Sequence, residues 1–378
     1  MALVKVKTTQ VYNLINQIQS EVLGESAVSM EDLRKVVDVG VALENADLMG
    51  NFLSGLMLQI GKEILVERPY KSSAPNIYRD QVEYGQIVAK YRGKLDDASE
   101  NQSWSLRNNT SYDEDIFVES FVDVTLFSEQ DAYEIRKSIP QDQYKGSFKS
   151  AEAMTNFVGM LFTMVYNSIE VKREALVMRV INNLIATTIY DNNAVRYVKL
   201  VTLYNSLFSA SLTDATCLYE PKFLKWAGTQ IRKYQRLMTR YATIYNIKGA
   251  DTHTPKEMQH LILHADFIDN YVAFSESDTF HKELISLPLY EETPYWQGTG
   301  TGLADTRKIH VTTAGGNEVT NTKVIGVLFD HDACGILEDS PRTNVKYNFA
   351  ADFSNYWFKQ KVRFFNDFNE SVIVFTLD

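Results

Sequence analysis

One long run of helical periodicity, from residue 150 to residue 187, constrains the fold more than any other feature. Its apolar side chains fall on a single stripe: Met154, Val158, Leu161, Val165, Ile169, Leu176, Val180 and Leu184. The stripe is interrupted by a charged cluster: Glu170, Lys172, Arg173 and Glu174. Unbroken, such a helix is about 55 Å long at ~1.5 Å per residue. The sequence therefore predicts an elongated subunit built along a helical spine.

Three shorter helices are predicted before this spine. Residues 8–23 carry one apolar face and stop at Gly24, and residues 30–43 form a second helical stretch. Residues 47–64 are apolar almost all round, which indicates a buried helix.

The segment between these helices and the spine differs in kind. Residues 82–92 and 116–127 read as two strands, separated by the largely polar residues 93–115 with six acidic and two basic side chains. So long a connection is uncommon in a compact domain, and an isolated two-stranded hairpin is marginally stable in water. We expect an arm that needs a partner surface, for which a neighbouring subunit is one candidate; an ordinary surface loop is the alternative.

The remainder of the chain mixes strands with helices. Helices are expected at 220–237 and 266–272, and turns at 298–302 and 366–369. Strands are expected at 197–204, 241–245, 260–264, 323–329, 356–364 and 371–377. Since no regular βαβ rhythm occurs, the predicted fold class is α+β.

Composition narrows the functional classes. The chain has 378 residues, 45% of them hydrophobic, and a net charge of -10, which argues against nucleic-acid binding as its main task. Cys217 and Cys334 have no metal-binding spacing, so neither a zinc site nor a disulfide framework is expected. The first ten residues lack the apolar core of a signal peptide, and the longest uncharged stretch, 153–169, is too short and polar to span a membrane.

No catalytic motif is found. Gly298, Gly300 and Gly302 lack the strand and helix that a dinucleotide fingerprint requires. The apolar residues between His260 and His264 favour a structural pair on a strand over a metal site. Asp330-His331-Asp332 could transfer protons, although a solvated strand end explains it more simply. We expect no cofactor.

A basic stripe lies on the strand predicted at 356–364. Lys359, Lys361 and Arg363 face one side, and apolar residues face the other. We interpret this stripe as a charged face between subunits or on the interior of an assembly, rather than as a sequence-specific nucleic-acid site.

Several stretches, in this order, resemble the major capsid proteins of tailed double-stranded-DNA phages, particularly those infecting Gram-positive bacteria. They are TTQVYNLINQIQSEVLGE, VDVGVALENADLMGNFLSGLMLQIGKEILVERPY, DQVEYGQIVAKYR, SWSL at 103–106, the spine segment 150–186 and FFNDFNESVIVF at 364–375. The resemblance covers nearly the whole chain, and the order of the stretches carries it.

The resemblance implies an HK97-like capsid fold with four parts. These are an N-terminal arm with helices (1–75), an extended loop (76–126), a peripheral domain with the spine helix (127–189 and 343–364) and an axial domain (190–342 and 365–378).

The resemblance also implies pentamers and hexamers closed into an icosahedral shell around DNA, in a virion assembled in the host cytoplasm. The region before the first core helix is short, so a separate scaffolding protein is expected. A portal protein is expected as a second partner, and a decoration protein is a further candidate. No Lys–Asn crosslinking pair is identified, so noncovalent assembly is expected. The intersubunit candidates are Tyr84, Lys90, Arg92, Trp104, Arg107, Phe117 and Phe121.

Two other functional classes stay open at this point. One is an encapsulin-like compartment shell enclosing protein cargo, and the other is a cytoplasmic enzyme with an unrecognised site.

Overall fold

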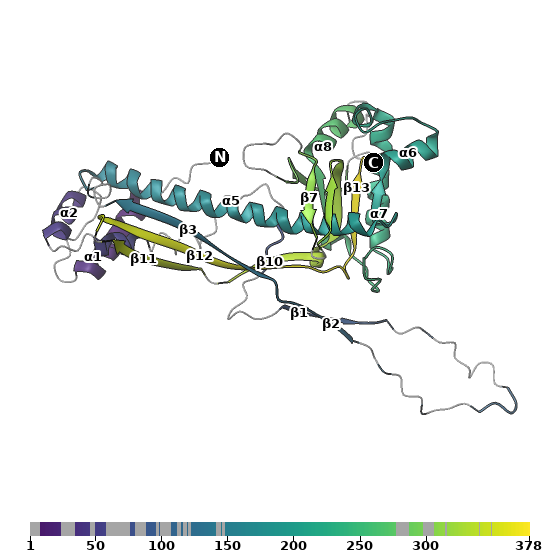
Figure 1. Ribbon diagram of the computed structural model, residues 1–378, viewed down its shortest axis with the longest axis horizontal. Helices are drawn as coiled ribbons and strands as arrows, with labels where there is room; N and C mark the ends of the chain where they lie inside the picture. The colour runs from purple at the N-terminus through teal and green to yellow at the C-terminus, as the bar shows by residue number, and fades with distance from the viewer. Residues whose placement is uncertain are drawn as a thin grey trace.

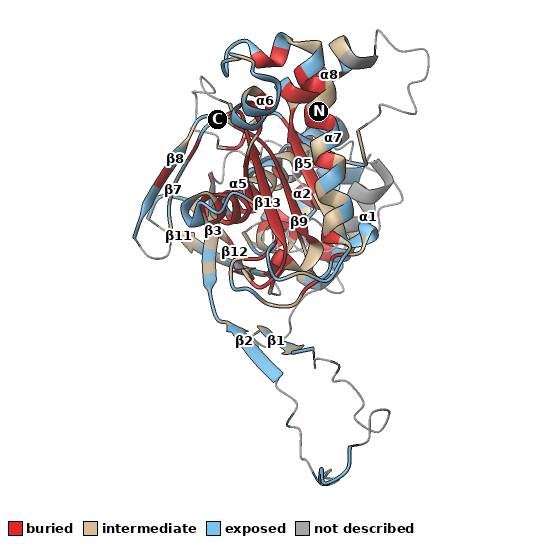
Figure 2. Ribbon diagram, turned by 90° about the vertical axis from the view of Figure 1, so that its right-hand side faces the viewer, coloured by how far each residue is buried: buried red, intermediate tan, exposed pale blue. Residues whose placement is uncertain are grey.

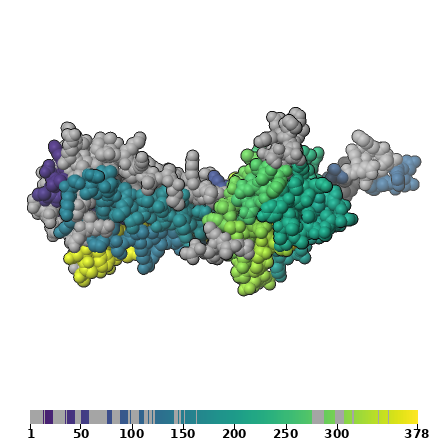
Figure 3. Space-filling view, turned by 90° about the horizontal axis from the view of Figure 1, so that it is seen from above, coloured from purple at the N-terminus to yellow at the C-terminus, as the bar shows by residue number. Residues whose placement is uncertain are grey.

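The computed structural model is elongated and consists of two lobes, with one long helix running through both (Figure 1). That helix, α5 (Ala151–Asp191), runs along the first lobe and ends in the second. Figure 3 shows the lobes from above, teal and yellow at the left and green at the right. The structure describes residues 8–23, 35–45, 50–57, 76–79, 88–95, 98, 107–111, 115, 119, 122–140, 145, 148–276, 287–297, 306–313, 316–339, 341–348 and 350–378.

Helix α5 confirms the predicted spine. Its 41 residues correspond to about 60 Å at ~1.5 Å per residue. Ser150 begins the helix by accepting a hydrogen bond from the Ala153 amide at 3.1 Å. Asn192 ends it in the left-handed conformation, with a φ of 49°.

The charged interruption of the stripe marks the junction between two hydrophobic cores. Residues before it, such as Val158 and Val165, belong to one core, and residues after it, such as Leu184, belong to another. At the junction the buried guanidinium of Arg173 donates two hydrogen bonds to the buried Glu338 carboxylate, at 2.9 and 2.6 Å. This cation is therefore a tie between the helix and a strand.

The first lobe packs helices on an antiparallel sheet. The helices are α1 (Thr8–Leu23), α2 (Val36–Asn45), residues 50–57 and the first half of α5. The central strand is β12 (Phe353–Asn366), which pairs with β3 (Gln130–Pro140), β11 (Arg342–Asn348) and β10 (Cys334–Glu338). The alternation of β12 explains its place, because Tyr356 and Phe358 are buried in the helical core.

The second lobe is built on a five-stranded sheet of order β4-β13-β9-β5-β6. These strands are β4 (Tyr197–Lys199), β13 (Val372–Thr376), β9 (Val324–Asp330), β5 (Gln259–His264) and β6 (Glu291–Thr293). Figure 2 shows its central strands in red, because every residue of β9 and β13 is buried. A strand buried on both faces requires cover on both faces.

Two sets of elements provide that cover. The second half of α5 and the hairpin of β7 (Ile309–Thr312) and β8 (Glu318–Asn321) contribute to the core on one face. On the other face lie α6 (Leu200–Phe208), α7 (Pro221–Met238) and α8 (Ala265–Tyr271). Short helical turns complete the lobe at Cys217–Tyr219, Lys256–Met258, Val272–Glu276 and His331–Ala333.

Most predicted elements are confirmed, and the fold class is α+β as expected. The helices at 8–23, 220–237 and 266–272 and the strands at 260–264, 323–329, 356–364 and 371–377 all occur, as does the turn at 366–369. In the segments predicted at 30–43 and 47–64, residues 36–45 and 50–57 are helical, and most of the rest lies outside the described residues. The turn predicted at 298–302 also lies outside them.

Two strand predictions were wrong, and several strands were missed, among them β3, β7, β8 and β10. Strand β4 stops at Lys199, where α6 begins, so most of the predicted strand 197–204 is helical. Residues 241–245 form no strand and make only an isolated bridge between Ala242 and Thr252. The longest of them is β3, whose exposed side chains are mostly polar and whose inward ones, apart from the buried Ile139, are only half-buried.

Among the described residues, no helix combines the length and the apolar character that a bilayer crossing demands.

Candidate intersubunit surface at the extended hairpin

The predicted arm is present as a two-stranded antiparallel ribbon that leaves the body (Figure 1). It consists of β1 (Val88–Gly93) and β2 (Val122–Phe127), with Tyr91 opposite Val124 and Ala89 opposite Leu126. Because side chains alternate along each strand, the ribbon has two faces of different chemistry.

The inner face attaches the ribbon to its own chain through the turn between β12 and β13. The Lys90 ammonium lies 3.0 Å from the Asp367 carboxylate and also pairs with Glu370. Arg92 donates a hydrogen bond to the Asn369 carbonyl at 2.9 Å and pairs with the same Glu370 carboxylate. Two cations of one strand thus share one acidic side chain of the body.

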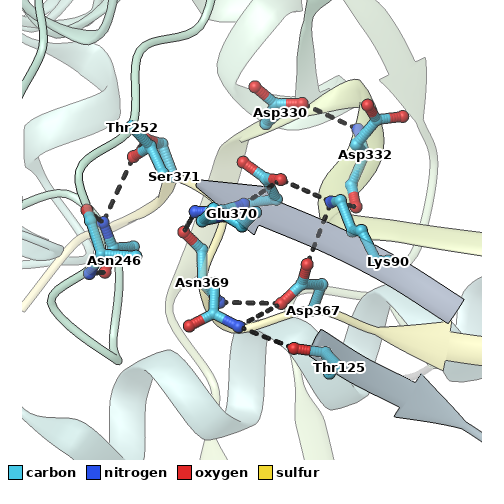
Figure 4. A network of polar contacts seen from close by, with 12 residues as sticks. Lys90, Thr125, Asn246, Thr252, Asp330, Asp332, Asp367, Asn369, Glu370 and Ser371 are labelled. Atoms are coloured by element: carbon cyan, nitrogen blue, oxygen red, sulfur yellow. Dashed lines mark hydrogen bonds and ion pairs between the residues drawn. The ribbon is translucent and has the colours of Figure 1, made fainter. Parts of the chain in front are cut away.

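The receiving turn is preorganised, as Figure 4 shows. The Asp367 carboxylate accepts hydrogen bonds from both the backbone and the side-chain amide of Asn369, each at 3.0 Å. The Asn369 side chain also donates to the Thr125 hydroxyl of β2 at 3.4 Å, so both strands of the ribbon are held. Ser371 continues the network to Thr252 at 3.2 Å.

Glu370 is the electrostatic centre of this attachment. Burial raises the pKa of its carboxyl above the ordinary value, and the neighbouring ammonium of Lys90 opposes that rise. A buried carboxylate is stable when cations and hydrogen bonds replace its lost water. Lys90 and Arg92 supply both.

The outer face of the ribbon is apolar and exposed. Tyr91 is 71% exposed, Val122 56%, Val124 45% and Leu126 63%. No described part of the chain covers this face, and contiguous exposed apolar side chains mark surfaces that meet a partner.

A second attachment holds the segment that leads into the hairpin. The backbone of Arg79 donates to the Ile336 carbonyl at 2.9 Å, and Tyr78 forms a parallel bridge with Ile336. The Arg79 side chain hydrogen-bonds His331 and lies 3.2 Å from the Asp332 carboxylate.

His331 continues the second attachment into the five-stranded sheet. Its ring hydrogen-bonds His260 at 2.8 Å, and His260 hydrogen-bonds the Glu291 carboxylate at 2.8 Å. Burial, the Arg79 guanidinium and the His260 ring all lower the pKa of His331.

The structure describes some of the predicted intersubunit residues. Lys90 and Arg92 lie on the inner face of the ribbon, in contact with their own chain. Arg107 is exposed in the connection between the strands. The remaining predicted residues lie outside the described residues: Tyr84, Trp104, Phe117 and Phe121.

The predicted basic stripe on β12 is only partly exposed. Lys359 and Lys361 are exposed, but Arg363 is buried, so the prediction that Arg363 lies on an open face was wrong. Next to Lys361, Asp339 lies against strand β12, and the Asp339 backbone amide donates a hydrogen bond to the Lys361 carbonyl at 3.0 Å. The Arg363 guanidinium therefore lies beside the Asp339 carboxylate, at 3.9 Å.

Sequence reasoning missed the partners that hold the ribbon: Asp367, Asn369, Glu370, Arg79 and His331. The polar residues at 366–369 predicted a turn, which occurs, but nothing local indicates that it binds a strand almost 280 positions earlier. Asp330 is likewise buried, not solvated, because it accepts a hydrogen bond from the Thr254 hydroxyl at 2.6 Å.

The histidine and cysteine side chains outside the ribbon that could take part in catalysis lie in surroundings that favour a structural role. His264 is buried and accepts a hydrogen bond from the Asp266 amide at 3.2 Å. Burial raises the pKa of the Cys217 thiol to about 11 and that of Cys334 to about 12, which suppresses thiolate reactivity. No group of three His, Cys, Asp or Glu side chains within the described ranges is placed to hold a metal.

A family comparison identifies the chain. The model of the Phi29-like phage major capsid protein family matches residues 15–376. The chain belongs to this family. No curated protein matches it.

Solved structures agree with this assignment at the level of the fold. The capsid structure of Staphylococcus phage Andhra matches with a TM-score of 0.53 and 10% identity, over 82% of this chain and 87% of that one. A structure of the head fiber and inner core protein gp22 of native bacteriophage P68 matches with a TM-score of 0.50 and 11% identity, over 80% and 83%. The expected α+β phage capsid fold is thus confirmed, and this major capsid protein is a shell component of a phage virion.

Proposed function

We propose that copies of this major capsid protein associate as pentamers and hexamers and close into an icosahedral shell around double-stranded DNA. The DNA is enclosed without sequence-specific binding, and the protein has a structural rather than an enzymatic role. Assembly takes place in the host cytoplasm, is noncovalent, and uses a separate scaffolding protein and a portal, with a decoration protein as a further partner.

The two-faced ribbon is the observation that carries this proposal. Its inner face is bound to its own chain by Lys90 and Arg92, whereas its outer face exposes Tyr91, Val124 and Leu126. A lone ribbon of two strands is marginal in water, so the uncovered face needs a partner. In a shell, the partner always within reach is a neighbouring copy.

The parts of the subunit take matching roles in this proposal. Residues 1–75 form the N-terminal arm and helices, and residues 76–126 the extended loop. Residues 127–189 and 343–364 form the peripheral domain, and residues 190–342 and 365–378 the axial domain.

Expression of the full chain with and without its scaffolding protein, followed by negative-stain imaging, tests the proposal. We expect closed particles of uniform diameter with the scaffold present. A species that stays monomeric under every assembly condition would falsify the shell.

A compartment shell with protein cargo is the competing assembly, and the family match favours a phage head over it. The contents of particles purified from infected cells separate the two. Nuclease-protected DNA supports the phage head, and enclosed protein without DNA supports the compartment.

A further inference from the structure

Strands β7 and β8 form a hairpin at the border of the second lobe (Figure 2). Within the described residues β7 pairs with β8 alone, with Val311 opposite Val319 and Thr312 opposite Glu318. A groove with a volume of about 780 Å³ separates β7 and residues 295–297 from helix α5. Its lining on the α5 side includes Val171, Glu174, Ala175, Met178 and Arg179.

The hydrogen bonds of His310 show which edge of β7 borders the groove. The Gln297 side chain, part of the groove lining, accepts from the His310 amide at 2.6 Å and donates to the His310 carbonyl at 3.1 Å. Both backbone groups of His310 therefore point away from β8. Because successive residues of an antiparallel strand alternate between its two edges, the backbone groups of Thr312 also point away from β8. Thr313 turns back across the hairpin, where its amide donates to the Asn317 carbonyl at 2.8 Å.

The Gln297 side chain takes the place of a neighbouring strand for one residue only. Its carboxamide offers one acceptor and one donor to His310, as the backbone of an added strand would. Two positions further along, the N–H and C=O of the exposed Thr312 have no hydrogen-bond partner on this edge among the described residues. An open strand edge is a template for pairing with another extended chain.

We propose that the groove between β7 and α5 binds an extended peptide segment of a second protein, which adds to β7 as a third strand. In this mode of recognition the backbone hydrogen bonds supply affinity, and the alternate side chains that face the groove supply specificity. The volume of the groove lies within the range of ordinary ligand sites. The inference does not depend on shell formation, because one subunit forms the whole groove.

The α5 side of the groove favours apolar side chains in the bound peptide. Val171 and Ala175 are exposed there, and Met178 lies beside them in the lining. Apolar side chains of the peptide would cover these residues and remove their surface from water.

The charges of the groove favour an acidic residue in the peptide. The Arg179 side chain is 58% exposed, and its ion pair with the exposed side of Asp131 spans 3.5 Å. The Glu174 carboxylate, by contrast, already accepts a hydrogen bond from the Tyr295 hydroxyl at 2.7 Å. The expected ligand therefore alternates apolar and polar residues and places one acidic side chain beside Arg179.

A synthetic peptide of alternating valine and threonine with one central aspartate is a suitable probe. Its affinity for the unassembled full-length chain is measured by fluorescence anisotropy. Thr312→Pro removes the outward N–H of β7 but no hydrogen bond to β8, so probe binding is expected to weaken at least about tenfold. The matched control is Glu318→Pro, which removes the outward N–H at the opposite edge of the hairpin. This control should bind the probe as the wild type does.

Charge reversal provides a second variant that leaves the backbone intact. Arg179→Glu should weaken binding of the aspartate probe and strengthen binding of the same peptide with lysine in place of aspartate. The control Arg240→Glu changes an exposed arginine that follows α7, on the other face of the five-stranded sheet, and should alter neither affinity. Melting temperatures of all variants establish that they are folded.

Amide hydrogen exchange at single residues locates the contact. The probe should slow exchange at Thr312 and leave Val311, which already faces β8, unchanged. Protection of Thr312 without the probe would overturn the proposal: it assigns the edge to the chain itself, or to a second copy where protection rises with subunit concentration. The proposal is also wrong if the probe does not bind the wild type, or if Thr312→Pro binds it equally well. Binding of a probe whose alternate amides are N-methylated contradicts strand addition in the same way.

Discussion

Single residues decide how firmly the extended hairpin is attached to its subunit. Glu370 is the clearest case, since one buried carboxylate binds two cations of the same strand. Asp367 is a second acceptor for Lys90 but not for Arg92. The attachment is thus concentrated in very few atoms.

The Glu370→Gln substitution keeps the shape of the side chain and removes its charge. Because Lys90 and Arg92 lose their shared partner, we expect the attachment to weaken by about 1–3 kcal/mol. Faster amide hydrogen exchange across 88–93 measures the effect. The matched control is Glu134→Gln, whose pair with the exposed Arg136 is worth less than ~1 kcal/mol. Equal exchange rates in both variants contradict the role given to Glu370.

Acid is expected to loosen the second attachment. The pKa of His331 is lowered from 6.5 by burial, Arg79 and His260, against the opposing charges of Asp332 and Asp330. The unfolded chain then binds a proton at this ring more readily than the folded chain does. The free energy of unfolding therefore falls as the pH drops below about 6.5, until the pH passes the lower folded pKa.

Comparison with His331→Gln isolates this contribution. Between pH 7 and pH 5 the melting temperature of the wild type should fall further than that of the variant. The buried His264 titrates in both proteins, so only the difference between the two slopes is informative. If the melting temperatures of the wild type and of His331→Gln fall equally between pH 7 and pH 5, His331 is excluded as the acid-sensitive group.

Among the secondary-structure elements, α5 carries the clearest signal of burial. Its two faces differ sharply: Val165 is 1% exposed and Val171 is 67% exposed. We expect Val165→Asp to lower the free energy of unfolding by about 3–5 kcal/mol, because it places an unpaired charge in the core. Val171→Asp, six positions further along the same helix, should cost less than ~1 kcal/mol. The free energies of unfolding of both variants are measured by denaturant titration. Similar unfolding midpoints for the two variants would contradict the assignment of Val165 to the core.

The same elements also indicate what a single sequence can reveal. The spine, β12 and the α7 helix were predictable because their burial follows the period of their own backbone, whereas β13 was predictable as a continuous apolar run. Strand β3 was missed because Glu134 and Arg136 are exposed while most of its inward residues are only half-buried. Residues 197–204 are a short apolar run, which periodicity alone cannot assign, and the strand there ends after three residues.

The candidate surface was predictable only in part, for a related reason. A polar segment between two strands indicated an arm, and Lys90 and Arg92, predicted as intersubunit residues, contact their own chain. Their partners at Glu370 and Asn369 lie almost 280 positions away, and no local pattern encodes that proximity. The burial of Arg363 likewise depends on a tertiary neighbour, Asp339.

At the scale of the whole molecule, folding and assembly should be separable. The described hydrophobic cores lie in the two lobes and draw on no residue of the stretch 93–115. Deleting Gly93 to Asp115 is therefore expected to leave a soluble subunit whose melting temperature lies within a few degrees of the wild type. We expect that subunit to form no closed shells, as judged by negative-stain imaging. Normal shells from the deleted chain would mean that the arm is not an intersubunit grip.

The continuity of α5 across both lobes has a mechanical consequence. A straight helix about 60 Å long acts as a lever, so tilting it by about one degree moves its far end by roughly 1 Å. Strand β12 runs beside it (Figure 1) and is joined to β13 by a single turn, so the helix and the strand together resist bending between the lobes. A small change in the tilt of α5 therefore shifts one lobe relative to the other, and the stiffness of this one helix limits how far a subunit bends when it joins a curved shell.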